Sequence, residues 1–343
     1  MYSETELDGA VAAGVIPREA AQAFRDHVAA QRRAPAVDEE HFRLLSGFND
    51  IFVTIAIALL LVAVAQIGDK LAPWAAGLFV AGLSWPLAEY FTRRRRLALP
   101  SILLLLAFVG GVAAVPTGVL VDVDPGFSDR VNMVILAGIG LLAAGAAWVH
   151  WRRFMVPITV AAGAVAIAAV AIGLVLAALP SAEQAAYPVV LVAGLGVFLF
   201  AMRWDMTDRE RLTRRSDVAF WLHLAAAPMI AHPLFHMLGV FEQDIGPATA
   251  IVVIALYLLF AFVALTVDRR ALLVSSLAYV LYALYALFTK AGAVELSAAF
   301  TALIIGSALL TLSAFWHPMR RRAVTLLGDL RHRLPPVQMP AVV

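Results

Sequence analysis

Long apolar runs alternate with short polar segments along most of the 343-residue chain. A helix needs about 20 mostly apolar residues to cross the hydrocarbon core of a bilayer. The runs that approach or meet this length are 48–68, 71–91, 97–120, 133–150, 155–179, 187–202, 219–241, 247–267, 271–288 and 295–316. The sixth run is short. The pattern predicts an all-α, polytopic membrane helix bundle of about ten transmembrane helices.

Composition supports this class of protein. Hydrophobic residues make up 62% of the chain and charged residues 15%, whereas soluble domains have about 45–50% apolar and about 25% charged residues. The absence of cysteine excludes disulfides, thiolate metal sites, iron–sulfur clusters and cysteine nucleophiles. The net charge is +2, and the arginines flank the apolar runs, where membrane topology explains them. We therefore expect contact with lipid and no nucleic-acid partner.

The distribution of basic residues predicts the orientation. Cytoplasmic loops of membrane proteins carry an excess of Lys and Arg. If the N-terminus is cytoplasmic, 23 of the 26 Lys and Arg residues fall inside, and only Lys70, Arg130 and Lys290 fall outside. An odd number of helices would scramble this alternation. We therefore expect ten spans, an inner-membrane location and both termini in the cytoplasm.

Two polar regions flank the predicted membrane domain, which covers residues 48–318. Residues 1–47 predict a small cytoplasmic helical hairpin and a pre-membrane segment, with one helix over Glu4–Ala13, a break at Gly14 and a second helix from Pro17. Residues 319–343 predict an amphipathic interfacial tail. Its apolar face comprises Val324, Leu327, Leu330 and Leu334, and Pro335 and Pro336 end the helix.

Two predicted hairpins look alike in sequence. Gly82, Trp85, Arg96 and Pro100 in the first correspond to Gly145, Trp148, Arg153 and Pro157 in the second, and the proline lies four positions after the arginine in both. A duplicated hairpin explains this pattern. The regular alternation of spans and loops explains the recurrence of arginine clusters equally well.

The seventh run differs most from a plain apolar helix. It contains three histidines, His223, His232 and His236, together with Pro228 and Pro233. Ionisable residues within a membrane span usually face the bundle interior or a water-filled cavity. Each proline also removes a backbone hydrogen bond. The sequence predicts a central helix that is kinked or broken, as in transporters that bind solutes near the midplane.

The spacing of the histidines separates them into two groups. His232 and His236 lie four residues apart, so one helix face presents both imidazoles for a metal ion or a proton relay. On an ideal helix His223 lies about 180° away from His232. The glutamate of HEXXH-type sites and thiolate ligands are missing. Neutral histidines that form hydrogen bonds inside a packed bundle are the alternative.

Asp217 and Trp221 precede these histidines at a spacing of four residues, near the predicted inner surface. Asp217 is suited to cap the N-terminus of the helix, because its carboxylate can accept hydrogen bonds from the free amides of the first turn. The alternative is an inner gate or proton acceptor that leads toward His223.

Three further side chains are candidates for a transport path. Glu89 lies near the inner end of the second run, deep enough to pair with a histidine or an arginine. Tyr279 and Tyr282 continue a polar stripe that begins at Ser275 in the ninth run. The stripe lines a cavity or forms hydrogen bonds between helices.

Three segments carry a resemblance to a known family: AGVIPREAAQAF, FRLLSGFNDIFV and RRSDVAFWLHLAAAPMIAHPLF. Together they resemble the multi-pass bacterial membrane proteins of the domain of unknown function 2157 type, over most of the chain. The resemblance implies a bacterial inner-membrane protein. It implies no catalytic residue and no cofactor.

Three functions remain open from the sequence. The first is a transport-like bundle that passes a proton, cation or small solute, with His223, His232 and His236 as candidate relays. The second is a membrane sensor or assembly scaffold, in which residues 1–47 recruit a cytoplasmic protein. The third is a haem-binding redox protein, which ranks last because only the seventh run is expected to hold buried histidines. Motifs of soluble active sites are missing, so an enzyme is not the leading expectation.

Overall fold

The computed structural model describes residues 4–31, 48–179, 182–209, 211, 213–240, 247–290, 296–328 and 334–335. Within these ranges the regular elements are helices, which confirms the predicted all-α class. The chain divides into two compact units, one made of Met1–Glu40 with Met339–Val343 and the other of His41–Gln338.

The first unit contains a helical hairpin. Helix α1 (Glu4–Ala12) and helix α2 (Arg18–Gln31) are joined by a turn in which Gly14 has a φ of 70°. Glycine adopts this left-handed conformation without steric cost. Pro17 directly precedes α2, and Ala21 of α2 is buried. The helices therefore form where the glycine and proline signals place them.

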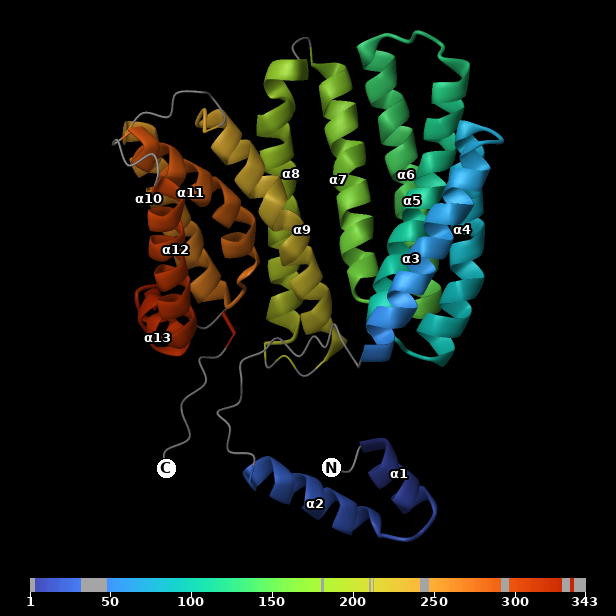
Figure 1. The fold of residues 1–343 in the computed structure, drawn as a ribbon, viewed down its shortest axis with the longest axis vertical. Helices are drawn as coiled ribbons and strands as arrows, with labels where there is room; N and C mark the ends of the chain where they lie inside the picture. The colour runs from blue at the N-terminus through green and yellow to red at the C-terminus, as the bar shows by residue number, and fades with distance from the viewer. Residues whose placement is uncertain are drawn as a thin grey trace. The chain divides into compact units, whose positions relative to one another are not determined.

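The second unit is a bundle of longer helices (Figure 1). These helices are α3 (Phe48–Asp69), α4 (Pro73–Ala88), the π-helix η1 (Glu89–Arg94), α5 (Ala98–Val123), α6 (Asp129–Phe154), α7 (Ile158–Ala178), α8 (Ala182–Thr207), α9 (Arg214–Met237), α10 (Pro247–Val267), α11 (Ala271–Lys290), α12 (Ser297–Ala314) and α13 (Trp316–Thr325).

Eight helices of the described chain have the length and composition needed to cross a membrane: α3, α5, α6, α7, α8, α9, α10 and α12. Helices α4 and α11 occupy the second and ninth predicted runs; α4 has 16 residues and continues into η1, and α11 has 20 residues. Helix α8 has 26 residues and extends beyond 187–202 at both ends, so the sixth span is not short. The protein is thus a helical bundle with several helices that are long and apolar enough to span a membrane, which is compatible with an integral membrane protein.

Consecutive helices pair as antiparallel hairpins, with α4 against α5, α6 against α7, α8 against α9 and α10 against α11. The turns of these four hairpins lie at the same end of the bundle, the lower end in Figure 1. Each turn holds one non-glycine residue in the left-handed region, and these residues are Arg96, Met155, Arg211 and Asp268. The similarity of the first two hairpins in sequence is accompanied by this shared turn geometry.

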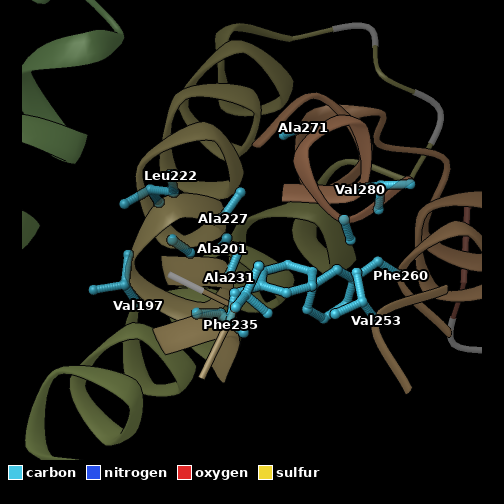
Figure 2. Packing of buried hydrophobic residues seen from close by; sticks show 14 of the residues in the cluster. Val197, Ala201, Leu222, Ala227, Ala231, Phe235, Val253, Phe260, Ala271 and Val280 are labelled. Atoms are coloured by element: carbon cyan, nitrogen blue, oxygen red, sulfur yellow. The ribbon is translucent and has the colours of Figure 1, made fainter. Parts of the chain in front are cut away.

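Helix α9 is the most buried of the eight candidate spans. Buried residues make up 56% of its apolar stretch, against 17–39% in the other seven. Leu222, Ala227, Ala231 and Phe235 pack there against residues of α8, α10 and α11 (Figure 2). The predicted central position of this helix is confirmed.

The sequence predicts that the prolines kink or break the helix, and of these two alternatives the break is wrong. Helix α9 continues from Arg214 to Met237 through both Pro228 and Pro233. Each proline removes one backbone hydrogen bond of the helix. Packing of the surrounding helices against α9 outweighs that loss.

The C-terminal helix differs in extent from the predicted amphipathic tail. Helix α13 begins at Trp316 and ends at Thr325, before a turn in which Gly328 has a φ of 54°. Val324 is buried within α13, and Leu334 is buried beyond it. Leu330 lies outside the described residues. The helix therefore stops well before the two prolines that were expected to end it.

Candidate functional site

A group of buried charged side chains lies where the turns after α8 and α10 meet. We call Asp205, Ser216, His223 and Arg269 the buried cluster. Asp205 comes from the last turns of α8, Ser216 and His223 from α9, and Arg269 from the turn between α10 and α11. The side chains of Asp205, His223 and Arg269 are only 1%, 2% and 3% exposed.

Asp205 is the centre of the cluster. One carboxylate oxygen, Oδ2, lies 2.8 Å from Nε2 of His223, and the other, Oδ1, accepts a hydrogen bond of 2.7 Å from Nη2 of Arg269. The same Nη2 donates to the backbone oxygen of Ser216 at 3.1 Å. The ring of Phe198 meets the His223 ring edge-on, with centroids 5.1 Å apart. The cluster thus joins an imidazole, a carboxylate and a guanidinium inside the protein.

The N-terminus of α9 is capped by residues that precede it. Thr213 occupies the N-cap position, and its side-chain oxygen accepts a hydrogen bond from the backbone N–H of Arg215. The Asp208 carboxylate accepts hydrogen bonds from the backbone N–H groups of Thr213 and Ser216. The prediction that Asp217 caps the helix is therefore wrong, because α9 begins at Arg214 and places Asp217 inside the first turns.

A second carboxylate connects the same turns to α13. Asp268 accepts hydrogen bonds from Nη1 of Arg211 at 3.0 Å and from Nε1 of Trp316 at 2.8 Å. Nε of Arg320 lies 3.4 Å from its Oδ1. Arg269, next in sequence, belongs to the buried cluster. One short turn therefore links α8, α9 and α13.

The sequence analysis identified His223 but missed its partners. Asp205 falls in the segment RWDMTDRERLTRRSD, which resembles a loop because it is highly charged. Helix α8 extends through Thr207 and carries Asp205 into the interior. Arg269 was assigned to topology alone. One sequence signal could have identified this partner: a carboxylate near the end of one apolar helix, opposite a histidine on the next.

The other two histidines of α9 lie elsewhere. His232 and His236 are exposed, and Nδ1 of His232 lies 2.8 Å from the Tyr279 hydroxyl of α11. His236 stacks on Tyr187 near the start of α8, with ring centroids 3.8 Å apart. Tyr187 and Asp205 are 18 positions apart on α8, which corresponds to about 27 Å along a helix axis. The structure therefore does not bring the three histidines into one site.

A metal site at His232 and His236 lacks further ligands in the described part of the chain. Their ring centroids are 6.2 Å apart. Among the described residues no group of three or more His, Cys, Asp or Glu side chains comes together. Protein sites for zinc usually supply at least three such ligands.

The remaining sequence candidates are dispersed. Glu89 pairs with Arg153 of α6 at 2.5 Å and with Arg93 at 3.3 Å, at the end of the bundle that carries the turns. Trp221 is half-buried on α9. Tyr279 stacks on Phe235 with ring centroids 4.5 Å apart, whereas Tyr282 is exposed.

A fourth histidine corrects the expectation that buried histidines occur only in the seventh run. His150 near the end of α6 is fully buried. Its Nδ1 lies 3.4 Å from the Thr159 hydroxyl, and its ring packs among Trp85, Phe108 and Phe154. These neighbours include neither a carboxylate nor a second histidine.

The chain matches no family model, no curated protein and no solved structure. The resemblance to the domain of unknown function 2157 group therefore stays a prediction. The functional interpretation rests on the geometry of the described residues.

Proposed function

We propose that the protein is a transport-like membrane bundle in which α9 lines the path of a proton, cation or small solute. Of these, a proton agrees best with the buried cluster, because imidazole and carboxylate groups bind and release protons, whereas the Asp205 carboxylate is already paired with Arg269 and is a poor ligand for a metal cation. The observation that carries the proposal is the contact between His223 and Asp205, both almost fully buried between α8 and α9.

The two ends of α9 have different characters. At one end, His232 and His236 are exposed beside Tyr187 and Tyr279. At the other end lies the buried cluster. Small buried residues, including Ala227 and Ala231, separate the two along the helix. In our proposal, protons reach the exposed histidines from one side and the buried cluster closes the other side.

The orientation is part of the proposal. The four hairpin turns carry arginines, and the basic residues of these turns belong on the cytoplasmic side by the positive-inside rule. This orientation places the buried cluster near the cytoplasm, with both termini on that side. It corresponds to a bacterial inner-membrane protein.

Flux through reconstituted protein tests the proposal. We expect liposomes containing the protein and a trapped pH-sensitive dye to respond to an imposed proton gradient faster than empty liposomes. Replacing the proton-binding side chain in His223→Gln should abolish this difference. The readout is the initial rate of the change in luminal pH, normalised to the amount of folded protein.

His150→Gln is the matched control, because His150 is also a buried histidine but contacts no carboxylate among the described residues. We expect its flux to equal that of the unaltered protein. Equal rates in protein-containing and empty liposomes would refute proton transport. An equal loss of proton flux in both histidine variants would show that the buried cluster has no special role in transport.

A scaffold is the second candidate, and one observation favours it. The α1–α2 hairpin belongs to a unit separate from the bundle and exposes the apolar side chains of Val15 in its turn and Phe24 on α2. Exposed apolar residues on a small hairpin suit the docking of another protein. If deletion of residues 1–47 abolishes binding of a partner but leaves proton flux intact, the hairpin serves as a docking module.

A further inference from the structure

An open hollow lies beside the end of α8 that leads into α9. Its volume is about 350 Å³, and it is lined by Phe200, Arg203, Trp204, Thr207 and Arg215. The first four residues come from the last turns of α8, and Arg215 comes from the first turn of α9. The hollow is therefore lined by two aromatic side chains and by two arginine side chains from different helices, and its wall is almost entirely apolar.

The two arginines of the hollow differ from other arginines around them. Arg209 donates to the backbone oxygen of Leu334, and Arg214 donates to that of Met155. Within the described residues, neither Arg203 nor Arg215 has an acceptor for its guanidinium. Two exposed arginine side chains thus border a hollow whose wall is almost entirely apolar.

The position of the hollow in a membrane bundle restricts its ligand. Helix α8 is long and apolar enough to span a bilayer, and the hollow lies at its polar end. Tryptophan is enriched at this depth, where the ring contacts both acyl chains and headgroups. Guanidinium groups bind phosphate oxygens in a planar, bidentate arrangement.

We propose that this hollow binds the headgroup phosphate of an anionic phospholipid. Arg203 and Arg215 bind the phosphate oxygens, while Phe200 and Trp204 contact the glycerol and the upper acyl chain. Two guanidinium charges favour a headgroup with net negative charge, such as phosphatidylglycerol. In a zwitterionic headgroup the ammonium adds positive charge beside the arginines and weakens binding.

The bound lipid connects two helices next to the buried cluster. Arg203 and Trp204 precede Asp205 on α8, and Arg215 precedes Ser216 on α9. A phosphate shared by both arginines therefore holds together the two helix ends that supply the cluster. The inference requires only that the bundle is embedded in a membrane, and it is independent of proton transport.

Lipid binding to purified protein tests the inference. Delipidated protein in detergent is titrated with phosphatidylglycerol or phosphatidylcholine, and bound lipid is counted by native mass spectrometry. We expect phosphatidylglycerol to bind more tightly. The double variant Arg203→Gln/Arg215→Gln should bind it about tenfold more weakly or worse, the effect of losing a single charge-assisted hydrogen bond.

The matched control is Arg94→Gln/Arg321→Gln, which removes the same charge from two exposed arginines outside the hollow. We expect its affinity for phosphatidylglycerol to be unchanged. Equal affinities of the two double variants, or equal binding of both lipids by the unaltered protein, would overturn the proposal. If the hollow variant fails to fold, the charge-preserving Arg203→Lys/Arg215→Lys variant should show a smaller loss, because lysine cannot bind bidentately.

A second measurement locates the lipid and separates it from a soluble anion. Phosphatidylglycerol brominated near the headgroup end of its chains should quench tryptophan fluorescence in the unaltered protein, and Trp204→Phe should remove part of that quenching. Inorganic phosphate at the same concentration should not displace the lipid. Displacement by inorganic phosphate, or quenching that is unaffected by Trp204→Phe, would contradict a lipid site in this hollow.

Discussion

Replacing Asp205 by asparagine tests whether the buried cluster holds the bundle together. Asparagine has nearly the same shape and keeps an oxygen that can accept a hydrogen bond. The substitution therefore removes charge while changing little else. The guanidinium of Arg269, 2.7 Å from Oδ1 and 3% exposed, then remains in the interior without its counterion in the cluster.

Removing one partner of a buried ion pair typically costs about 3–5 kcal/mol, because the other charge is left uncompensated. We expect Asp205→Asn to lower the free energy of unfolding by that amount. The double variant Asp205→Leu/Arg269→Met should recover most of the loss, since well-packed apolar replacements of a buried ion pair are often neutral or stabilising.

The assay is reversible unfolding in mixed micelles by a denaturing detergent, followed by circular dichroism. Glu89→Gln is the matched control: it also removes a carboxylate that binds an arginine, but Glu89 is 29% exposed and Arg153 is 42% exposed. Solvent-exposed pairs contribute little to stability, so its unfolding curve should overlay that of the unaltered protein. Equal shifts for Asp205→Asn and Glu89→Gln would refute the reasoning.

Two more predictions concern helix packing and the turn at Asp268. Gly111→Ala should separate α4 from α5 and cost about 1–3 kcal/mol in unfolding, the usual effect of overpacking, because its new methyl group would lie 2.8 Å from backbone atoms of Gly77 and Ala81. Gly110→Ala meets nothing within 4 Å and should be neutral or stabilising, so a larger loss at Gly110 would contradict this packing. Asp268→Asn preserves the left-handed backbone but removes the charge that faces Arg320 of α13, so α13 should be released and limited trypsin digestion there should become faster. An unchanged digestion rate would show that this carboxylate does not hold α13.

The sequence predicted best those features whose stability depends on residues close together along the chain. Transfer of apolar side chains into lipid sums along one helix, so hydropathy alone located the long helices. The cost of placing histidine in a membrane span indicated that α9 is central. Gly14 and Pro17 likewise act on their own turn, and the α1–α2 hairpin forms there.

The partners of His223 could not be read in the same way. Asp205 and Arg269 are 64 positions apart, and their contact depends on how two hairpins pack. The predicted end of α8 was also wrong. Its last turns are rich in charged residues and resemble a loop in sequence, although the helix continues to Thr207. His150 was overlooked for a related reason: it lies at the end of its apolar run, where solvent exposure is the ordinary expectation.

Helices α5, α6 and α8 each have 26 residues, a length of about 39 Å at 1.5 Å per residue. The hydrocarbon thickness of a typical bilayer is about 30 Å. The apolar part of α5 exceeds this thickness, so α5 must tilt or thicken the surrounding lipid to avoid hydrophobic mismatch, whereas the charged ends of α6 and α8 can reach the headgroup region. Beside α5, helix α4 has 16 residues and continues directly into the six-residue π-helix η1, so this segment is shorter than α5. The hydrophobic thickness that the helices require therefore differs around the protein. We expect a change in acyl-chain length to alter the tilt of the hairpins relative to one another.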